Sequence, residues 1–191
     1  MPINEVSVAD RETEVFIRRR IAAAFPDDGI LGEEGGDDRA GKPVVWVIDP
    51  IDGTACFVNA MYTWCVSIAV VVDGVPTIGA VYDPNAKELF HGVAGAHAGV
   101  SAGAWVNDKP ATVKDVADFR GGVLGAGFSH RSQPDEFTPF LSRLLSQGAR
   151  LAAAAALPML TRPARASAPG ARALAMSHTH THERIELVYA D

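Results

Sequence analysis

The hydrophobic and polar positions near the start of the chain follow the period of a helix. Apolar residues recur every four positions from Ile17 to Phe25, opposite a charged face, and this pattern predicts an amphipathic helix that ends near Pro26. Ser7 and Asp10 have the spacing of a capping box, in which side-chain oxygens accept from the free amides of the first turn. The chain therefore opens with a helix whose start is marked by polar residues.

Downstream of this helix, β-branched and aromatic runs bounded by turn residues predict a series of strands. Asp73-Gly74 is a hairpin turn signal between two such runs. The expected strands are Ile30–Leu31 (a strand or a loop), Val44–Ile48, Trp64–Val72, Val75–Tyr82, Glu88–Val93, Gly103–Asn107 and Gly122–Phe128, followed by a short helix over Pro139–Leu145. We expect Trp64–Val72 to be buried on both faces. One helix and several mostly antiparallel strands indicate an α+β or layered α/β domain.

The composition changes after residue 145. No acidic residue occurs from Phe137 to His182, and Ala149–Ala175 contains twelve alanines and three prolines. Alanine favours a helix, but the prolines would break one repeatedly. We therefore expect a domain over residues 1–145 and a poorly ordered Ala/Arg/Pro-rich tail over residues 146–191. The tail is either genuine or the product of a disturbed reading frame.

Charge and composition limit the classes of partner. The net charge is −6, and residues 27–52 alone carry eight acids against two bases, so the rest of the chain is formally neutral. We therefore expect no nucleic acid and no anionic membrane surface as a general partner. No apolar run approaches the ~20 residues of a membrane helix, and no secretion signal opens the chain. The two cysteines lack metal-ligand spacing, so we expect a reduced, cytoplasmic protein.

The run Trp46–Thr54 contains the residues that are most informative about a possible functional site. The preceding strand delivers Asp49 at its end, and Pro50 is expected to stop the strand, so that the chain turns. The turn exposes the carbonyl of Ile51 and returns Asp52 beside Asp49. Two carboxylates and a carbonyl are hard oxygen ligands of the kind that Mg²⁺ prefers.

The residues after these acids fit an anion. Gly53 permits close backbone approach, and Thr54 can cap a following helix, whose free amides attract phosphate. The alternative is that Asp-Pro and Asp-Gly are simply turn formers. Gly32-Glu33-Glu34 ends a separate upstream segment and could add a third carboxylate, which favours the site over the turn.

These motifs together resemble the inositol monophosphatase family, the lithium-sensitive phosphatases related to fructose-1,6-bisphosphatase. Asp49-Pro-Ile-Asp-Gly-Thr54, preceded by Trp-Val-Ile, resembles the family signature, and Gly32-Glu33-Glu34 resembles its upstream acidic motif. Further similar elements are Val8-Ala9-Asp10, Gly79–Tyr82 and Gly103–Asn107, so the resemblance covers roughly residues 3–145.

The resemblance implies a hydrolase with two or three Mg²⁺ ions. Carried over by position, Glu33, Asp49 and the carbonyl of Ile51 would hold one metal ion, and Asp49 and Asp52 would reach a second. Glu33 would also help water to bind a third ion. Such ions neutralise phosphate charge and activate water.

The resemblance also implies roles for the neighbouring residues. Thr54, oriented by Asp10, and Glu33 would position the attacking water, while Asp52 and the amides of Gly53 and Thr54 would bind the phosphate. Attack is direct, without a phosphoenzyme. We interpret Cys56 as a residue that packs a helix rather than as a nucleophile, because no histidine is placed by the sequence to activate it. The alternating His178, His180 and His182 are interpreted as incidental composition.

The sequence departs from the family pattern at its second half. The family has a C-terminal Trp-Asp motif, but none of Trp46, Trp64 and Trp105 is followed by aspartate. We therefore expect the N-terminal α+β half of a layered inositol monophosphatase-type sandwich, with the C-terminal α/β half largely missing.

Two functions follow from these observations. The first is an Mg²⁺-dependent phosphomonoesterase acting on a small phosphorylated metabolite, most simply inositol-1-phosphate, with histidinol phosphate, fructose-1,6-bisphosphate and 3′-phosphoadenosine 5′-phosphate as rivals. The second is a catalytically impaired fragment that only binds metal or phosphate. Homodimers are common in the family, so a second copy of the chain is a candidate partner.

Overall fold

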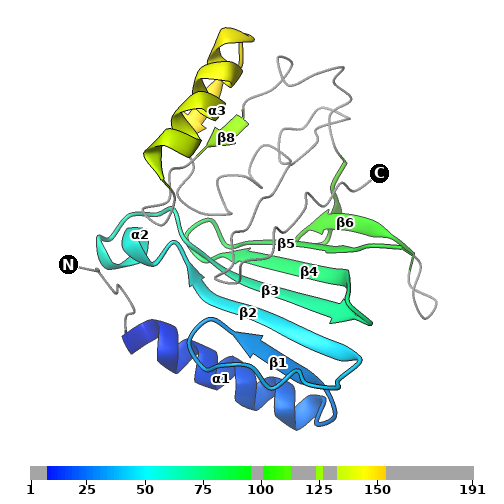
Figure 1. The fold of residues 1–191 in the computed structure, drawn as a ribbon. Coiled ribbons are helices and arrows are strands. Elements are labelled where there is room, and N and C mark those ends of the chain that lie inside the picture. Colours follow the sequence, from blue (N-terminus) through cyan, green and yellow to red (C-terminus); the bar gives the residue numbers. More distant parts are fainter. Residues whose placement is uncertain (1–7, 96–100, 113–123, 127–132, 154–191) are drawn as a thin grey trace.

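The computed structural model describes residues 8–95, 101–112, 124–126 and 133–153 of the chain (Figure 1). Its main feature is a seven-stranded sheet whose strands lie in chain order. These strands are β1 (Gly29–Gly32), β2 (Val44–Asp52), β3 (Cys65–Val72), β4 (Val75–Asp83), β5 (Glu88–Val93), β6 (Gly103–Val106) and β7 (Lys109–Pro110). The other described elements are the helices α1 (Val8–Ala24), α2 (Thr54–Val58) and α3 (Pro134–Ser146) and the strand pair β8 (Leu124–Ala126) and β9 (Leu151–Ala153).

The sheet is mixed. β1 pairs with β2 in parallel, and every later pair from β2 to β7 is antiparallel. The predicted hairpin between β3 and β4 is confirmed, because Asp73 (φ 49°) and Gly74 (φ 80°) both adopt the left-handed backbone that a tight two-residue turn requires. The α+β character predicted from the sequence is thus present as a mixed sheet with helices beside it.

The end of β2 differs from the prediction. Pro50 does not stop the strand, which continues to Asp52 with a shift of register between Asp49 and Asp52. Proline lacks an amide hydrogen, and a bulge is a place in a sheet where a ladder hydrogen bond is already interrupted. The bulge therefore replaces the turn that the sequence suggested, and it still leaves both acids at the same end of the strand.

Other predicted boundaries also needed adjustment. The predicted helix Pro139–Leu145 is part of α3, which begins at Pro134. The short strand β7 was not predicted. β3 is only partly buried, with Cys65 and Val70 as its buried residues, so the expectation of burial on both faces was wrong.

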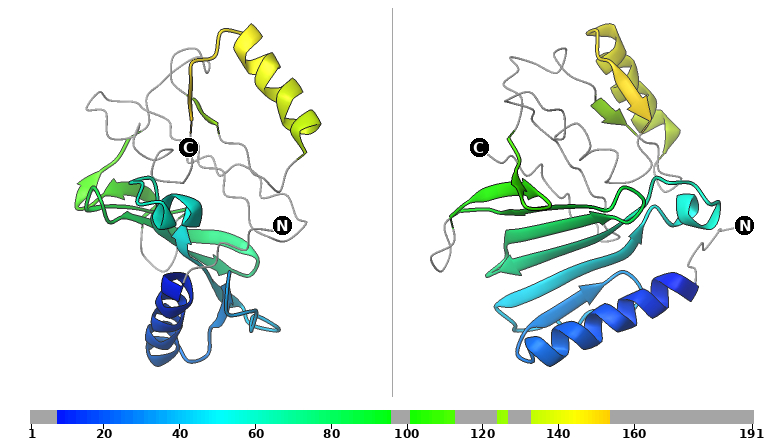
Figure 2. Two further views of the ribbon diagram at one scale, coloured as in Figure 1. Left: turned by 90° about the vertical axis from the view of Figure 1, so that its left-hand side faces the viewer. Right: turned by 180° about the vertical axis from the view of Figure 1, so that it is seen from behind.

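A small apolar core fixes α1 against the sheet. Ile21 of α1, Ile30 of β1 and Ile48 of β2 are buried together, with Ile17 and Trp46 packed against them. Full burial of such a side chain contributes roughly 1.5–3 kcal/mol. The views in Figures 1 and 2 show α1 running alongside β1 and β2, with α2 at the far end of β2. The core therefore places the start of α1 near the carboxyl end of β2.

Part of the predicted tail has regular structure. β9 lies within residues 146–191 and pairs in parallel with β8, which itself lies inside the predicted strand Gly122–Phe128. In Figures 1 and 2 these strands and α3 lie on the opposite side of the main sheet from α1. Ser7, the remainder of the predicted strand Gly122–Phe128 outside β8, and His178, His180 and His182 lie outside the described residues. None of the helices in the described ranges has the length and apolar character needed to cross a membrane.

Candidate active site

The parallel pairing of β1 with β2 brings two distant acids to one edge of the sheet. Gly32 and Ile48 are the last pair in register. Glu33 directly follows Gly32 at the end of β1, and Asp49 directly follows Ile48 in β2. Because parallel strands end at the same edge, the two side chains become neighbours although sixteen positions separate them in the sequence. The negative charge of Glu33 therefore acts on the Asp49 carboxyl group.

Asp49 is the most perturbed acid of this edge. Burial, then the charges of Glu33 and Asp52 and the hydrogen bond with Glu33, raise the pKa of Asp49 to about 8, against a smaller lowering by the amide of Ile51. Its Oδ1 is buried and has no hydrogen-bond partner among the residues that the structure describes. A buried, unpaired carboxylate oxygen among other acids is costly unless a positive charge approaches it.

Asp52 lies across the bulge from Asp49 and opposite Cys65 of β3. The Cys65 thiol donates to Asp52 Oδ2 at 3.5 Å. Burial, followed by the charge of Asp52, raises the pKa of the fully buried Cys65 thiol far above its ordinary value, so this thiol stays protonated and is a donor rather than a nucleophile.

The segment after the acids is held by Gly53 and Thr54. Gly53 is the N-cap of α2 in the left-handed conformation (φ 92°), and no side chain caps this helix, so the expected capping by Thr54 was wrong. The Thr54 hydroxyl instead faces the Ile51 carbonyl at 3.1 Å and Asp10 Oδ1 at 3.4 Å. Asp10 of α1 is only 2% exposed, so the predicted pairing of Thr54 with Asp10 joins α1 to the end of β2.

The sequence comparisons agree with this arrangement. The model of the inositol monophosphatase family matches residues 2–166. The chain belongs to the inositol monophosphatase family. This match extends beyond residue 145, where the resemblance read from the motifs ended. Proteins of this family are phosphatases that depend on metal ions.

Individual relatives carry several names. The chain is 39% identical to the Nus factor SuhB of Xylella fastidiosa over 66% of its length and 44% of that protein's. It is 34% identical to the inositol-1-monophosphatase of Synechocystis over 81% of its length and 54% of that protein's. It is 38% identical to the histidinol-phosphatase of Chlorobaculum parvum over 59% of its length and 41% of that protein's. The chain thus spans about half the length of the curated relatives it matches.

Solved structures of the family have the same fold. The crystal structure of the extragenic suppressor protein suhB from Bartonella henselae aligns with a TM-score of 0.71 and 26% identity, over 86% of this chain and 61% of that one. The mixed sheet with its helices is therefore shared with this relative. The described residues contain the seven-stranded sheet, the β8–β9 pair and three helices, and the layered sandwich stays a prediction.

The sequence analysis missed Glu14 and named Glu34 only as part of the Gly32-Glu33-Glu34 motif. Glu14 of α1 is buried, and it accepts hydrogen bonds from the amides of Glu34 and Gly35. Burial, then the charges of Glu33, Asp10 and Glu14, raise the pKa of Glu34, against a lowering by Arg11. A signal for Glu14 existed, because Asp10 and Glu14 continue the stripe of Ile17 and Ile21 along one face of the helix.

The carboxylates suit a divalent cation in chemistry, although they do not form a closed cage. Within the described ranges, no group of three or more His, Cys, Asp and Glu side chains is arranged to hold a metal ion. The unpartnered Oδ1 of Asp49 and the raised pKa of its carboxyl group nevertheless mark a place that lacks positive charge. The crowding that favours a proton there also favours a cation, so the chemistry of these residues suits one.

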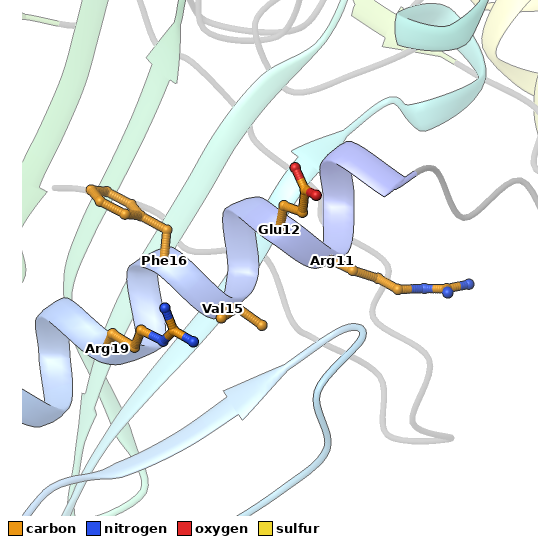
Figure 3. A pocket seen from close by; sticks show the side chains of 5 residues that line it. All are labelled: Arg11, Glu12, Val15, Phe16 and Arg19. Carbon is orange, nitrogen blue, oxygen red and sulfur yellow. The ribbon is translucent and has the colours of Figure 1, made fainter.

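A hollow on the outer face of α1 is separate from these acids (Figure 3). It is lined by Arg11, Glu12, Val15, Phe16 and Arg19, and none of these belongs to the acidic edge. The Phe16 side chain is exposed there. The candidate site is therefore the carboxyl edge of β1 and β2, and Cys56, which is buried in α2 beside it, has the packing position expected of it.

Proposed function

We propose that this chain is an Mg²⁺-dependent phosphomonoesterase that hydrolyses a small phosphorylated metabolite, with inositol-1-phosphate as the first substrate to test. Glu33, Asp49, Asp52 and the carbonyl of Ile51 hold the cation in this proposal. All four groups are hard oxygen donors at the carboxyl edge of β1 and β2. The bound cation supplies neutralisation of phosphate charge and activation of water.

The protein's own groups orient the water. The Thr54 hydroxyl directs its hydrogen toward Ile51 and Asp10, so its oxygen keeps a lone pair to accept from a water molecule. Glu33, which is exposed, would accept the second hydrogen. Water held between two acceptors presents its oxygen to the phosphorus, which supports direct attack without a covalent intermediate.

Asp52 and the backbone of Gly53 and Thr54 would bind the phosphate. Gly53 has a left-handed backbone, and because glycine has no Cβ, the phosphate could approach this backbone closely. The amides of Cys56 and Phe57 bond to the Gly53 carbonyl and are committed to α2. The amides that precede them in the first turn have no partner within the helix and suit an anion.

One observation carries the proposal. Asp49 Oδ1 is buried without a partner beside two other acids, in a chain that belongs to a family of metal-dependent phosphatases. A structural aspartate would be satisfied by donors, as buried polar groups almost always are. A cation ligand has this arrangement because its partner is the ion.

The decisive test is phosphate release from a panel of four esters: inositol-1-phosphate, histidinol phosphate, fructose-1,6-bisphosphate and 3′-phosphoadenosine 5′-phosphate. Each is assayed with Mg²⁺, with Mg²⁺ and Li⁺, and with a chelator. We expect release from at least one ester with Mg²⁺ and none with the chelator. Release that is equal with the chelator would overturn the proposal.

The second candidate function is binding of metal or phosphate without turnover. The sequence leaves it open, because none of Trp46, Trp64 and Trp105 is followed by the aspartate of the Trp-Asp motif. Calorimetric titration with Mg²⁺ separates the two, with Asp52→Asn as the site variant and the exposed Asp27→Asn as a control of equal charge change. Mg²⁺ binding that Asp52→Asn abolishes, together with no release from any ester, would establish the binding role.

A further inference from the structure

Glu14 is a buried carboxylate that the proposed chemistry does not use. It lies on the face of α1 that packs toward the sheet and is 1% exposed. Three donors satisfy it: the Glu34 amide at 2.7 Å from Oε2, and the Gly35 amide and Arg18 Nε, each at 2.7 Å from Oε1. Three charge-assisted hydrogen bonds offset the cost of burying this charge.

The partners of Glu14 lie on both sides of Glu33. A Cβ added to Gly32 or to Gly35 would come closer than 3.0 Å to the Glu14 carboxyl group, which is closer than real Cβ atoms approach. Gly32, which precedes Glu33, therefore lies directly against the Glu14 carboxyl group. The amide of Glu34, which follows Glu33, donates a hydrogen bond to Glu14. These two contacts fix the backbone of Glu33 from both directions.

Arg18 closes the arrangement. Its Nε is bonded to Glu14, and its Nη2 donates to the carbonyl of Gly36 at 2.5 Å, so one guanidinium links the helix to the far end of the loop. Arg18 is 20% exposed and Glu14 far less, so the pair is largely shielded from water. Gly36 itself has a left-handed backbone (φ 83°), which completes a tight turn around the carboxylate.

We infer that Glu14 is a positioning residue, which holds the loop over residues 32–36 so that Glu33 faces Asp49. The inference rests on the proposed function, because it gives Glu33 a task at the cation. Glu14 does not touch Asp49 or the cation in this arrangement; it acts through the backbone that it bonds. Without it, the loop has three glycines and no other described side chain that bonds the amides of Glu34 and Gly35.

The test replaces Glu14 by the isosteric Gln. An amide side chain has only one acceptor oxygen. Its NH₂ group would therefore face one of the donors that now bonds to a carboxylate oxygen of Glu14, and that bond would be lost. The control is Glu12→Gln, which changes the same charge on the exposed side of the same helix (Figure 3). Glycine variants give an independent check: Gly35→Ala collides with Glu14, whereas Gly79→Ala on β4 enters open space.

The first measurement is amide hydrogen exchange in the metal-free protein. We expect the Glu34 and Gly35 amides to exchange at least tenfold faster in Glu14→Gln and Gly35→Ala, with the amides of β3 unchanged. The two control variants leave all of these rates unchanged. Uniform acceleration over the whole sheet would indicate loss of global stability and would overturn the inference.

The second measurement is the Mg²⁺ requirement. We expect Glu14→Gln to raise the Kd for Mg²⁺ about 10–100-fold, as loss of a group that orients a metal ligand does. Saturating Mg²⁺ restores kcat, because Glu33 itself is intact. An unchanged Kd would overturn the inference. If the unaltered protein binds no Mg²⁺, the proposed function fails, and the exchange rates of Glu34 and Gly35 still decide whether Glu14 holds the loop.

Discussion

Two Asp-Pro pairs lie near the carboxyl ends of strands of the same sheet and have opposite characters. Asp49-Pro50 lies in the bulge of β2, whereas Asp83 is the last residue of β4 and Pro84 follows it. Asp83 is fully buried, and its Oδ1 accepts from the amides of Asn85 at 2.9 Å and Ala86 at 3.0 Å. Asp49 is buried with its Oδ1 unpartnered, and the neighbouring acids raise its pKa to about 8.

The difference lies in the surroundings of the dipeptide. The chain after Asp83 turns back, so its own amides satisfy the carboxylate, which is the turn-forming role common to aspartate. The chain after Asp49 continues along β3, and the neighbour supplied by β1 is another acid, Glu33. The same two residues thus stabilise a turn after β4 and form a candidate cation site in the bulge of β2, and both places lie at the same edge of the sheet.

The strongest way to break this comparison is to neutralise each aspartate in turn. We expect Asp49→Asn to lower Mg²⁺-dependent phosphate release by ~10²–10³-fold, since single electrostatic groups at active sites commonly have effects of that size. Asp83→Asn should leave the rate of the folded protein unchanged. Steady-state release with Mg²⁺ measures both variants. Equal losses in the two variants would contradict the assignment of different roles.

The pH dependence of stability is the next largest expected effect. The raised pKa of Asp49 means that the folded state binds its proton more tightly than the unfolded state does. This contribution is fully present below pH about 4 and is lost as the pH rises to about 8, at a cost on the order of a few kcal/mol. Thermal unfolding with a chelator should therefore show a falling Tm across this window.

Two controls sharpen that measurement. Asp49→Asn should have a flatter Tm profile than the unaltered protein, because the group that titrates is gone. Mg²⁺ should restore the Tm at pH 8, since a cation replaces the proton among the carboxylates. A profile that keeps its slope in Asp49→Asn would assign the effect to other groups.

The stability of the turn gives a smaller effect. Asp83→Asn replaces a charged acceptor of two backbone amides by a neutral one, and we expect a loss of ~1–3 kcal/mol in the free energy of unfolding. Denaturant titration measures this loss, and the calorimetric Kd for Mg²⁺ should not change. A weakened Kd in a folded variant would show that the turn and the site are coupled.

The smallest expected effect compares two Asp-Gly pairs. Gly53 (φ 92°) and Gly74 (φ 80°) both have left-handed backbone, so Gly53→Ala and Gly74→Ala should each lose roughly 1 kcal/mol of stability. Only Gly53→Ala should also slow phosphate release, because its backbone faces the proposed phosphate. A normal rate in Gly53→Ala at full folding would remove Gly53 from the proposed phosphate site.

Local patterns predicted the elements well. The four-residue period gave α1, the β-branched runs gave β2 to β5, and Asp73-Gly74 gave the hairpin, because each signal depends on residues close together in the chain. Errors occurred where a neighbour decided the geometry. Pro50 looked like the end of a strand, but β3 continues to pair beyond it and turns the irregularity into a bulge.

The sequence by itself indicated the residues of the candidate site: the acids at Glu33, Asp49 and Asp52, Gly53 and the hydroxyl of Thr54. Only the tertiary structure decided that Glu33 and Asp49 lie at one edge of the sheet, and that Glu14 bonds the backbone of the loop that contains Glu33. Parallel pairing of β1 with β2 and the packing of α1 join segments that are distant along the chain. Such contacts depend on register and on a shared core, and neither has a local signal in the sequence.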